Sequence, residues 1–251
     1  VAWSLSWDNT YEIAEFTPTM TGTYTIRVRK YRCSQSPMYL AWAWWQSPVV
    51  HIGGVSNNAQ GAGMDIADLD GNGRPDMVLM AYHAPWGGNS FRYRIGWDLD
   101  SQGETNLWTG YNSVGGVGWE GQGAGVEVGD LNGNGKLDMV LMAYDNPWGG
   151  NTFRYRIGWD MVNGIASWWT GTTIVGGVGW EGQGAGVELV DIDGNGTDEM
   201  VFVAYDNPWG GNNFRYRIGW NVNAFGVASW GGTYYIGGLG WEGQGAGVTL
   251  G

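Results

Sequence analysis

The chain has 251 residues, of which 12 are basic and 24 acidic, giving a formal net charge of -12. This acidic surplus disfavours binding to nucleic acid or to an anionic membrane surface and favours cations as partners. Its 47 Gly, 18 Trp and 13 Tyr with only 14% charged residues are typical of many short strands and tight turns, so we expect an all-β fold. No apolar run approaches the roughly 20 residues that a membrane-spanning helix needs.

Residues 1–45 alternate polar and apolar side chains like the strands of a β-sandwich, with Thr21-Gly22 as a turn signal. The string TGTYTIRV resembles the C-terminal half of the pre-peptidase C-terminal domain, a small β-sandwich appended to secreted enzymes. This resemblance implies a sandwich-like segment in a secreted protein. The single cysteine, Cys33, excludes an intrachain disulfide, and we expect it to be a small buried side chain.

Residues 46–251 contain an internal repeat, marked by the string QGAG at Gln60, Gln122, Gln183 and Gln244. Three full units of about 61 residues follow one another, over 61–122, 123–183 and 184–244, with partial units at both ends. Each unit contains about four predicted strands, the number found in one propeller blade. The sequence therefore predicts tandem β-propeller-type blades, and three blades alone form an incomplete ring.

Within a unit, the strand MVLMAY (77–82) is apolar at both alternating sets of positions, which predicts that both of its faces are covered. The strand FRYRIGW (91–97) instead alternates aromatic or aliphatic residues with Arg92 and Arg94. The segment PWGGN between them supplies the fixed and positive φ values of a hairpin turn.

An Asp-rich loop precedes the apolar strand of each unit, with sequences DLDGNGRPD, DLNGNGKLD and DIDGNGTDE. Oxygen donors stand at loop positions 1, 3, 5 and 9 with a carbonyl at position 7, and glycines at 4 and 6 let the backbone curl around one centre, as Ca²⁺ requires. The first loop offers Asp68, Asp70, Asn72, Asp76 and the Arg74 carbonyl; the second offers Asp130, Asn132, Asn134, Asp138 and the Lys136 carbonyl; the third offers Asp191, Asp193, Asn195, Glu199 and the Thr197 carbonyl. We therefore expect about three calcium sites.

Two other structures could account for these loops. An EF-hand needs a bidentate Glu at position 12, where the three loops carry Leu79, Leu141 and Phe202. Alternatively, the loops are Asx turns whose carboxylates cap only their own backbone. The pattern over 61–251 resembles the FG-GAP/VCBS repeats of integrin α-chain propellers and of some propeller lectins. That resemblance implies a calcium loop between the first two strands of each blade.

Recurring tryptophans are candidates for ligand binding, because an indole ring offers a flat platform to sugars, although packing between blades explains them as well. They are Trp86, Trp148 and Trp209 in turns and Trp119, Trp180 and Trp241 before a Glu. The arginines of the FRYR strands could bind an anion, but paired charge or stacking on aromatic rings is the simpler expectation.

Catalysis finds little support in the sequence. His51 and His83 have no repeated counterpart, and no nucleophile or zinc motif frames them. We expect a non-enzymatic, calcium-binding module, extracellular or on the cell surface, that presents loops to glycans or proteins. Two alternatives remain: a subunit of an extracellular fibre that self-assembles from interlocking copies, and the non-catalytic C-terminal part of a secreted hydrolase.

Overall fold

The computed structural model of the protein describes residues 59–83, 90–115, 121–145, 152–176, 184–205, 213–237 and 248. The chain divides into two compact units, Val1–Trp45 and Gln46–Gly251, and all described residues belong to the second. The prediction of a sandwich-like segment over 1–45 therefore lies outside the described residues, as do Cys33 and His51.

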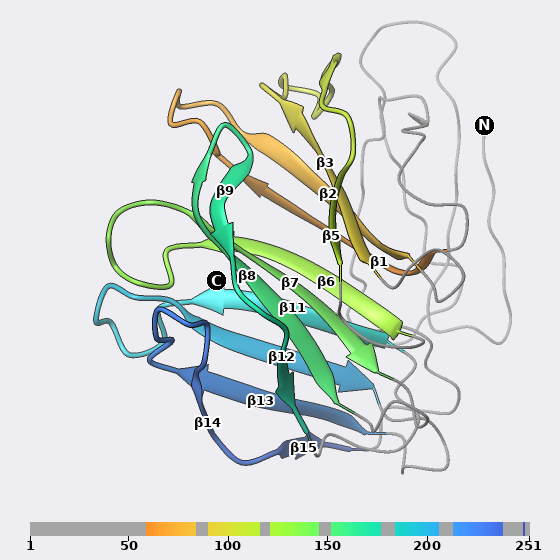
Figure 1. Cartoon of the computed structure of the whole chain (residues 1–251), viewed down its shortest axis with the longest axis vertical. Helices are drawn as coiled ribbons and strands as arrows, with labels where there is room; N and C mark the ends of the chain where they lie inside the picture. The colour runs from red at the N-terminus through yellow and green to blue at the C-terminus, as the bar shows by residue number, and fades with distance from the viewer. Residues whose placement is uncertain are drawn as a thin grey trace, which may run out of the picture. The chain divides into compact units, whose positions relative to one another are not determined.

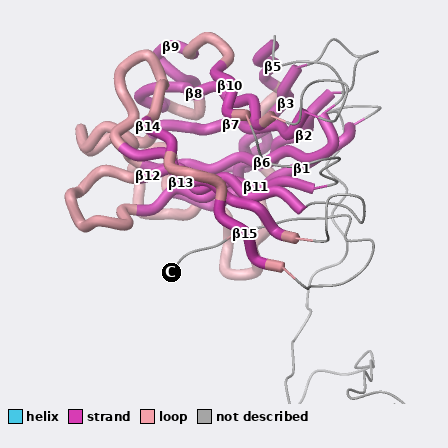
Figure 2. Tube along the Cα trace, turned by 90° about the horizontal axis from the view of Figure 1, so that it is seen from below, coloured by secondary structure: helices cyan, strands magenta, loops and turns pink. Residues whose placement is uncertain are grey.

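The described residues form an all-β structure of three antiparallel sheets without a helix, as predicted (Figure 2). The first sheet, blade 1, contains β1 (Ala59–Ala67), β2 (Asp76–His83), β3 (Ser90–Trp97), β4 (Leu107–Trp108) and β5 (Asn112–Gly115). Blade 2 contains β6 (Gly121–Gly129), β7 (Asp138–Asp145), β8 (Phe153–Val162), β9 (Ile165–Trp169) and β10 (Thr173–Val175). Blade 3 contains β11 (Gly184–Val190), β12 (Glu199–Tyr205), β13 (Phe214–Trp220), β14 (Ser229–Trp230) and β15 (Tyr234–Ile236). No described segment is a helix long and apolar enough to cross a membrane.

Each blade is a four-stranded meander whose outermost strand is broken into two short pieces. In blade 1, β4 and β5 both pair with β3. Thr109 lies at the break: its N–H donates to the Ile95 carbonyl, and its hydroxyl oxygen, in place of a backbone carbonyl, accepts the Ile95 N–H at 2.9 Å. Thr170 makes the same two contacts with Ile157 in blade 2. In these two blades the threonine side chain thus replaces one ladder bond at the break, whereas in blade 3 Gly231 stands at this position and its N–H donates to the Ile218 carbonyl.

The second strand of blade 2, β7, is covered on both faces, as its apolar sequence predicts, whereas in β2 Met77 and Leu79 are only partly buried. In β7, Met139, Leu141 and Ala143 belong to a core cluster with side chains of blade 1, such as Phe91. Val140 and Met142 belong to a second cluster with side chains of blade 3. Hence the hydrophobic core consists of the layers between successive blades, and each blade depends on its neighbours for burial.

The first strands of successive blades, β1, β6 and β11, lie against one another (Figure 1). They approach so closely that a Cβ added to Gly61 would lie 2.6 Å from the backbone nitrogen of Ala124, and one added to Gly63 would lie 2.8 Å from that of Val126. The glycines of the QGAG string are therefore required by the contact between blades. The described sheets follow one another as tandem blades and do not close a ring.

Candidate metal sites in the acidic loops

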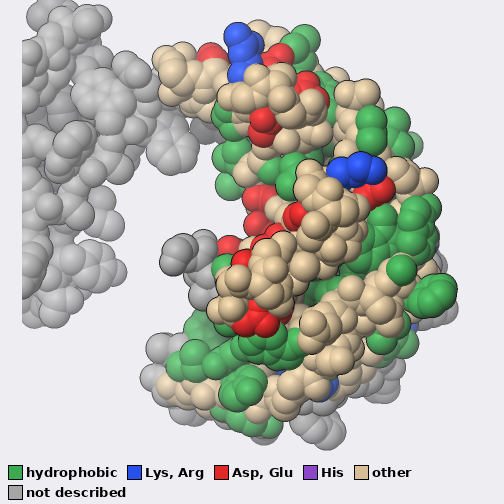
Figure 3. Space-filling model, turned by 90° about the vertical axis from the view of Figure 1, so that its left-hand side faces the viewer, with side chains coloured by type: hydrophobic (Ala, Val, Ile, Leu, Met, Phe, Trp, Pro, Cys, Tyr) green, Lys and Arg blue, Asp and Glu red, His purple; other side chains and the backbone are tan. Residues whose placement is uncertain are grey.

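The three acidic loops connect the first two strands of each blade, at 68–75, 130–137 and 191–198. All three lie on the same side of the array, at the left of Figure 1. Seen from that side, acidic side chains gather in separate places along the molecule (Figure 3). The prediction that such a loop precedes the apolar strand of each unit is confirmed in position.

The first loop is shaped by hydrogen bonds to the side chain of its first residue. Asp68 accepts the backbone N–H of Asn72 at 3.0 Å and that of Gly73 at 2.8 Å, while Asp70 also accepts the Asn72 N–H at 3.1 Å. Gly71 and Gly73 have φ values of 75° and 85°, in the left-handed region that favours glycine. These two glycines let the backbone turn back so that the carboxylates at positions 1 and 3 meet.

The other two loops repeat this arrangement. In the second, Asp130 accepts the N–H groups of Asn134 and Gly135 at 3.1 and 2.7 Å. In the third, Asp191 accepts those of Asn195 and Gly196, both at 2.9 Å. The side chain at position 5 also accepts the N–H two residues further on, at 2.8 Å in all three loops. One local sequence therefore produces one backbone shape three times.

The acid at position 9 is the first residue of the second strand and is buried in every blade: Asp76, Asp138 and Glu199 are at most 1% exposed. Asp76 accepts the Leu69 N–H at 2.9 Å and the Asp98 N–H at 2.8 Å. Burial and, to a smaller extent, the charges of neighbouring acids raise the pKa of all three acids, that of Asp138 to about 6. A cation beside these carboxylates would offset both effects, because it favours their charged form.

Two of the loops bring three carboxylates together. One oxygen each from Asp68, Asp70 and Asp76 lies within 4.8 Å of the others, and Asp191, Asp193 and Glu199 form the same kind of cluster. These two clusters could hold a metal ion. In the second loop position 3 is Asn132, whose amide donates to Asp138 at 3.3 Å, so this loop has two carboxylates and one amide at the same positions.

The donor set suits a hard cation. Carboxylate and amide oxygens from positions 1, 3, 5 and 9 are the ligands that Ca²⁺ prefers, and no softer donor is present in the loops. The hydrogen bonds from the backbone to Asp68 and Asp191 are also those of Asx turns, so loop shape alone does not distinguish the two interpretations. What an Asx turn does not explain is the convergence of a third, buried carboxylate from position 9 on the same point.

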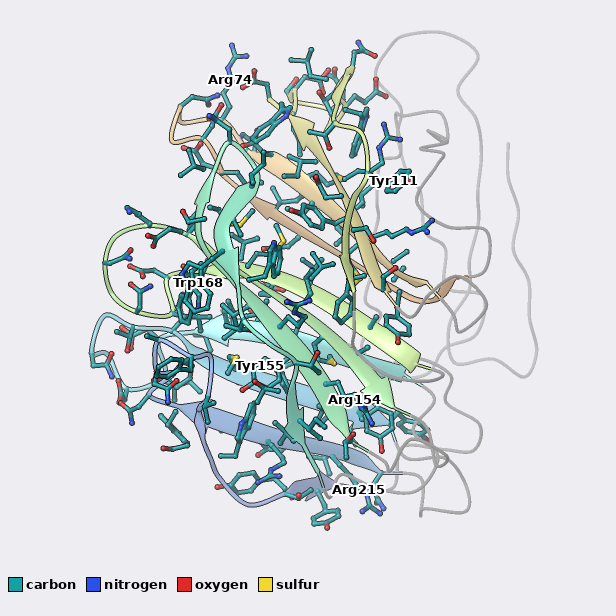
Figure 4. The ribbon with its side chains drawn as sticks, viewed as in Figure 1. Arg74, Tyr111, Arg154, Tyr155, Trp168 and Arg215 are labelled. Carbon is teal, nitrogen blue, oxygen red and sulfur yellow. The ribbon has the colours of Figure 1, made fainter. Side chains whose placement is uncertain are left out.

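The residues at position 7 of the loops form hydrogen bonds or ion pairs through their side chains. Lys136 Nζ lies 3.1 Å from Asp160 Oδ2. Arg74, labelled in Figure 4, has its Nη1 3.9 Å from Asp98 Oδ1. The Thr197 hydroxyl donates to Asn195 Oδ1. The role of the three carbonyls as ligands stays a prediction.

Two acidic neighbours of the loops were not among the predicted residues. Asp98 follows β3, Asp160 lies within β8, and they have positive φ values of 52° and 49°. They accept the side-chain amides of Asn72 and Asn134 at 2.9 and 2.8 Å, and so tie the first and second loops to the third strand of their blades. The repeat carries a signal for them, since IGW is followed by Asp, Asp and Asn in the three units.

The other candidate ligand-binding residues divide into two groups. All six tryptophans predicted as platforms lie outside the described residues: Trp86, Trp119, Trp148, Trp180, Trp209 and Trp241. The described arginines have structural contacts: Arg156 and Arg217 donate to the carbonyls of Gly115 and Gly176 in the preceding blade, both at 2.7 Å, and Arg215 lies 4.8 Å from the Tyr235 ring. The contact of Arg215 with an aromatic ring agrees with the expected stacking, whereas the printed bonds of Arg156 and Arg217 go to backbone carbonyls and were not predicted.

Comparison of the chain with models of protein families, with curated proteins and with solved structures finds no significant match. The resemblances to FG-GAP/VCBS repeats and to the pre-peptidase C-terminal domain therefore stay predictions from the sequence.

Proposed function

We propose that the protein is an extracellular calcium-binding recognition module without enzymatic activity, whose propeller-type blades are stiffened by Ca²⁺ in the three acidic loops. The observation that carries this proposal is the convergence of three carboxylates on one point in two loops, with the position-9 acid buried. Three like charges this close repel one another unless a cation or protons neutralise them.

An ion in such a loop would act on the blade through the chain's own residues. Asp68 and Asp70 belong to the turn, Asp76 begins β2, and Asp98, which follows β3, is bonded to both Asn72 and Asp76. Calcium bound to the loop would therefore join the beginnings and ends of three strands. Because positions 3 and 5 are exposed, we expect the moderate affinity of extracellular modules, with a Kd of roughly 0.1 to 1 mM.

Thermal unfolding with calcium and with EDTA tests the metal. A single site stabilises the folded state by about 2.7 kcal/mol when calcium is about 100-fold above the Kd, so calcium should raise the Tm clearly. Isothermal titration should count about three sites. Equal melting curves in calcium and EDTA, together with no heat of binding, would remove the proposal.

The variant Asp70→Asn sharpens the test, because it gives the first loop the position-3 amide that the second loop already has as Asn132. The amide still accepts the Asn72 N–H, so the turn is kept while one charge is lost. We expect about tenfold weaker binding at one site only. Asp100→Asn is the matched control, because Asp100 caps an exposed turn through the N–H groups of Gln102 and Glu104 and belongs to no acidic loop. It should leave every calcium affinity unchanged.

The recognition role is supported by the acidic composition and by the recurring tryptophans, and its ligands would be glycans or extracellular proteins. A glycan array probed in calcium and in EDTA tests this part separately. Binding in calcium that is lost in EDTA supports it. Absence of glycan binding together with a normal calcium response would argue against glycans as ligands and would not affect the proposed calcium sites.

The alternative of a self-assembling fibre subunit is favoured by one observation: Met64 in blade 1 and Ile236 in blade 3 are 60% and 54% exposed, although both are apolar.

A further inference from the structure

The second and third acidic loops contact each other through Asp198, the residue at position 8 of the third loop. Its carboxylate accepts the backbone N–H of Asp130 at 2.8 Å, and its own N–H donates to the Asp130 carbonyl at 3.1 Å. Asp130 is the position-1 acid of the second loop, and Asp198 directly precedes the buried Glu199 of the third. Two hydrogen bonds therefore connect two candidate metal sites.

The backbone beside this contact leaves room for it. A Cβ added to Gly129, the residue before Asp130, would collide with Asp198 Oδ2. One added to Gly133, at position 4 of the second loop, would lie 2.9 Å from the methyl carbon of Thr197 in the third loop. The two loops are thus packed against each other as well as hydrogen-bonded.

The first and second loops do not make this contact. The counterpart of Asp198 in the second loop is Leu137, whose side chain accepts no hydrogen bond. Within the described ranges, no hydrogen bond joins residues 68–75 to residues 130–137. A Cβ added to Gly71, at position 4 of the first loop, would meet nothing within 4 Å. The chain therefore contains one connected pair of loops and one pair without this connection.

An ion in the third loop would restrict the motion of Asp198, because its two neighbours in sequence, Thr197 and Glu199, are both candidate ligands of that ion. Through the two hydrogen bonds it would also restrict Asp130. The second loop would then lose less conformational freedom on binding its own ion. Repulsion between the two ions opposes this effect, but residues 132–136 and 193–196 are exposed, so water and salt screen the repulsion.

We propose that Asp198 is a positioning residue for the second loop, so that the second and third loops bind Ca²⁺ as a coupled pair while the first loop binds independently of the second. This inference rests on the proposed function, because it concerns calcium in the same loops. Coupling of this kind is reciprocal, since an ion in either loop raises the affinity of the other by the same factor. We expect a factor of about five, at the lower end of the usual range, because the contact consists of only two hydrogen bonds.

NMR spectra of the whole chain during a titration with calcium chloride give a separate measurement for each loop. In every loop the N–H of the glycine at position 6 donates to the carboxylate at position 1, so its resonance responds to an ion bound there. The three reporting amides are those of Gly73, Gly135 and Gly196. The calcium concentration at the midpoint of each shift measures the affinity of that loop.

Asp198→Leu gives the third loop the residue that the second loop has at this position, and removes the acceptor of the Asp130 N–H. The midpoint for Gly135 should rise by about fivefold, while that for Gly73 stays unchanged. Asp198→Asn is the conservative variant, because its side-chain oxygen still accepts this N–H. It should keep the Gly135 midpoint close to that of the unaltered chain, although it loses the same negative charge.

Asp193→Asn tests the coupling without altering the contact, because it removes a carboxylate ligand of the third loop only. It should also raise the midpoint for Gly135, by about threefold, since the third loop is then largely empty when the second one fills. In a chain that also contains Asp198→Leu, it should leave the Gly135 midpoint unchanged. Asp70→Asn is the matched control: it makes the same change in the first loop and should not move the Gly135 midpoint.

The outcomes separate this inference from the proposed function. Calcium shifts at all three glycines, with a Gly135 midpoint that neither Asp198→Leu nor Asp193→Asn raises, would overturn the coupling and keep the calcium sites. Equal weakening by Asp198→Leu and Asp198→Asn would also overturn it, because the charge rather than the contact would then be responsible. Glycine resonances that do not respond to calcium would overturn both.

Discussion

Replacing Glu127 by glutamine should make the stability of the protein less dependent on pH. Glu127 lies in the first strand of blade 2, between Asp65 of blade 1 and Glu188 of blade 3. Burial, together with the charges of Asp65 and Glu188 and a hydrogen bond with Asp65, raises its pKa to about 9. Asp65 in turn accepts the Val128 N–H at 2.8 Å across the junction. The protonated Glu127 is thus the natural donor to the Asp65 carboxylate.

The sign of the effect follows from where the proton is held. The folded chain keeps the Glu127 proton from the ordinary pKa of 4.5 up to about 9, whereas the unfolded chain releases it above 4.5. Stability is therefore lost as the pH rises through this window, by at most about 1.4 kcal/mol per pH unit for one proton. Because Glu127 is only partly buried and water screens its charge, we expect glutamine to stabilise the fold by about 2 kcal/mol at pH 8 and by nothing at pH 4.

Urea unfolding of both proteins at several pH values, followed by tryptophan fluorescence, measures this difference. Other groups that titrate in the same range, such as Asp138, cancel when the variant is compared with the unaltered chain. Glu104→Gln makes the same isosteric change outside the first strands and should leave the pH dependence as it is. Parallel curves for Glu127→Gln and the unaltered protein from pH 4 to 9 would refute the reasoning.

Two further predictions concern the junctions between blades. Gly61→Ala places a Cβ 2.6 Å from a backbone nitrogen of the next blade and should destabilise the protein by about 2 kcal/mol in urea unfolding. The control Gly110→Ala places its Cβ in open space and should be nearly neutral. Equal effects of the two variants would argue against the close approach of the blades. Tyr155→Phe leaves the Gly226 carbonyl without its buried donor and should cost about 1 to 2 kcal/mol by the same assay, whereas Tyr234→Phe at an exposed position should change little.

The fold was largely accessible from the sequence because the repeat fixes the number and order of strands. The apolar strands 77–82 and 139–144 predict cover on both faces, and β7 indeed packs between the sheets of blades 1 and 3. The break in the outermost strand was not predicted. It recurs in blade 3, where Gly231 stands in place of Thr109 and Thr170, so it does not depend on one residue type that a periodicity of side chains could reveal.

The sequence predicts those parts of the candidate site whose residues are close to one another along the chain. The positions within each loop follow from spacing, since the turn is made by residues near one another in sequence. Asp98 was missed because it stands 26 residues from Asn72, and only the pairing of strands brings the two together. The acids Asp65, Glu127 and Glu188 were missed for a related reason: they meet only when blades stack, and each by itself is an ordinary polar residue of a strand.

The close approach of the first strands also bears on how such a protein changes in size over evolution. Each blade presents glycine on one side and Ala or Val on the other at matching positions, so any unit fits whichever unit precedes or follows it. Duplication or deletion of one unit in the gene would then lengthen or shorten the protein without redesign of a contact. We therefore expect the number of repeat units to differ among proteins built from this repeat.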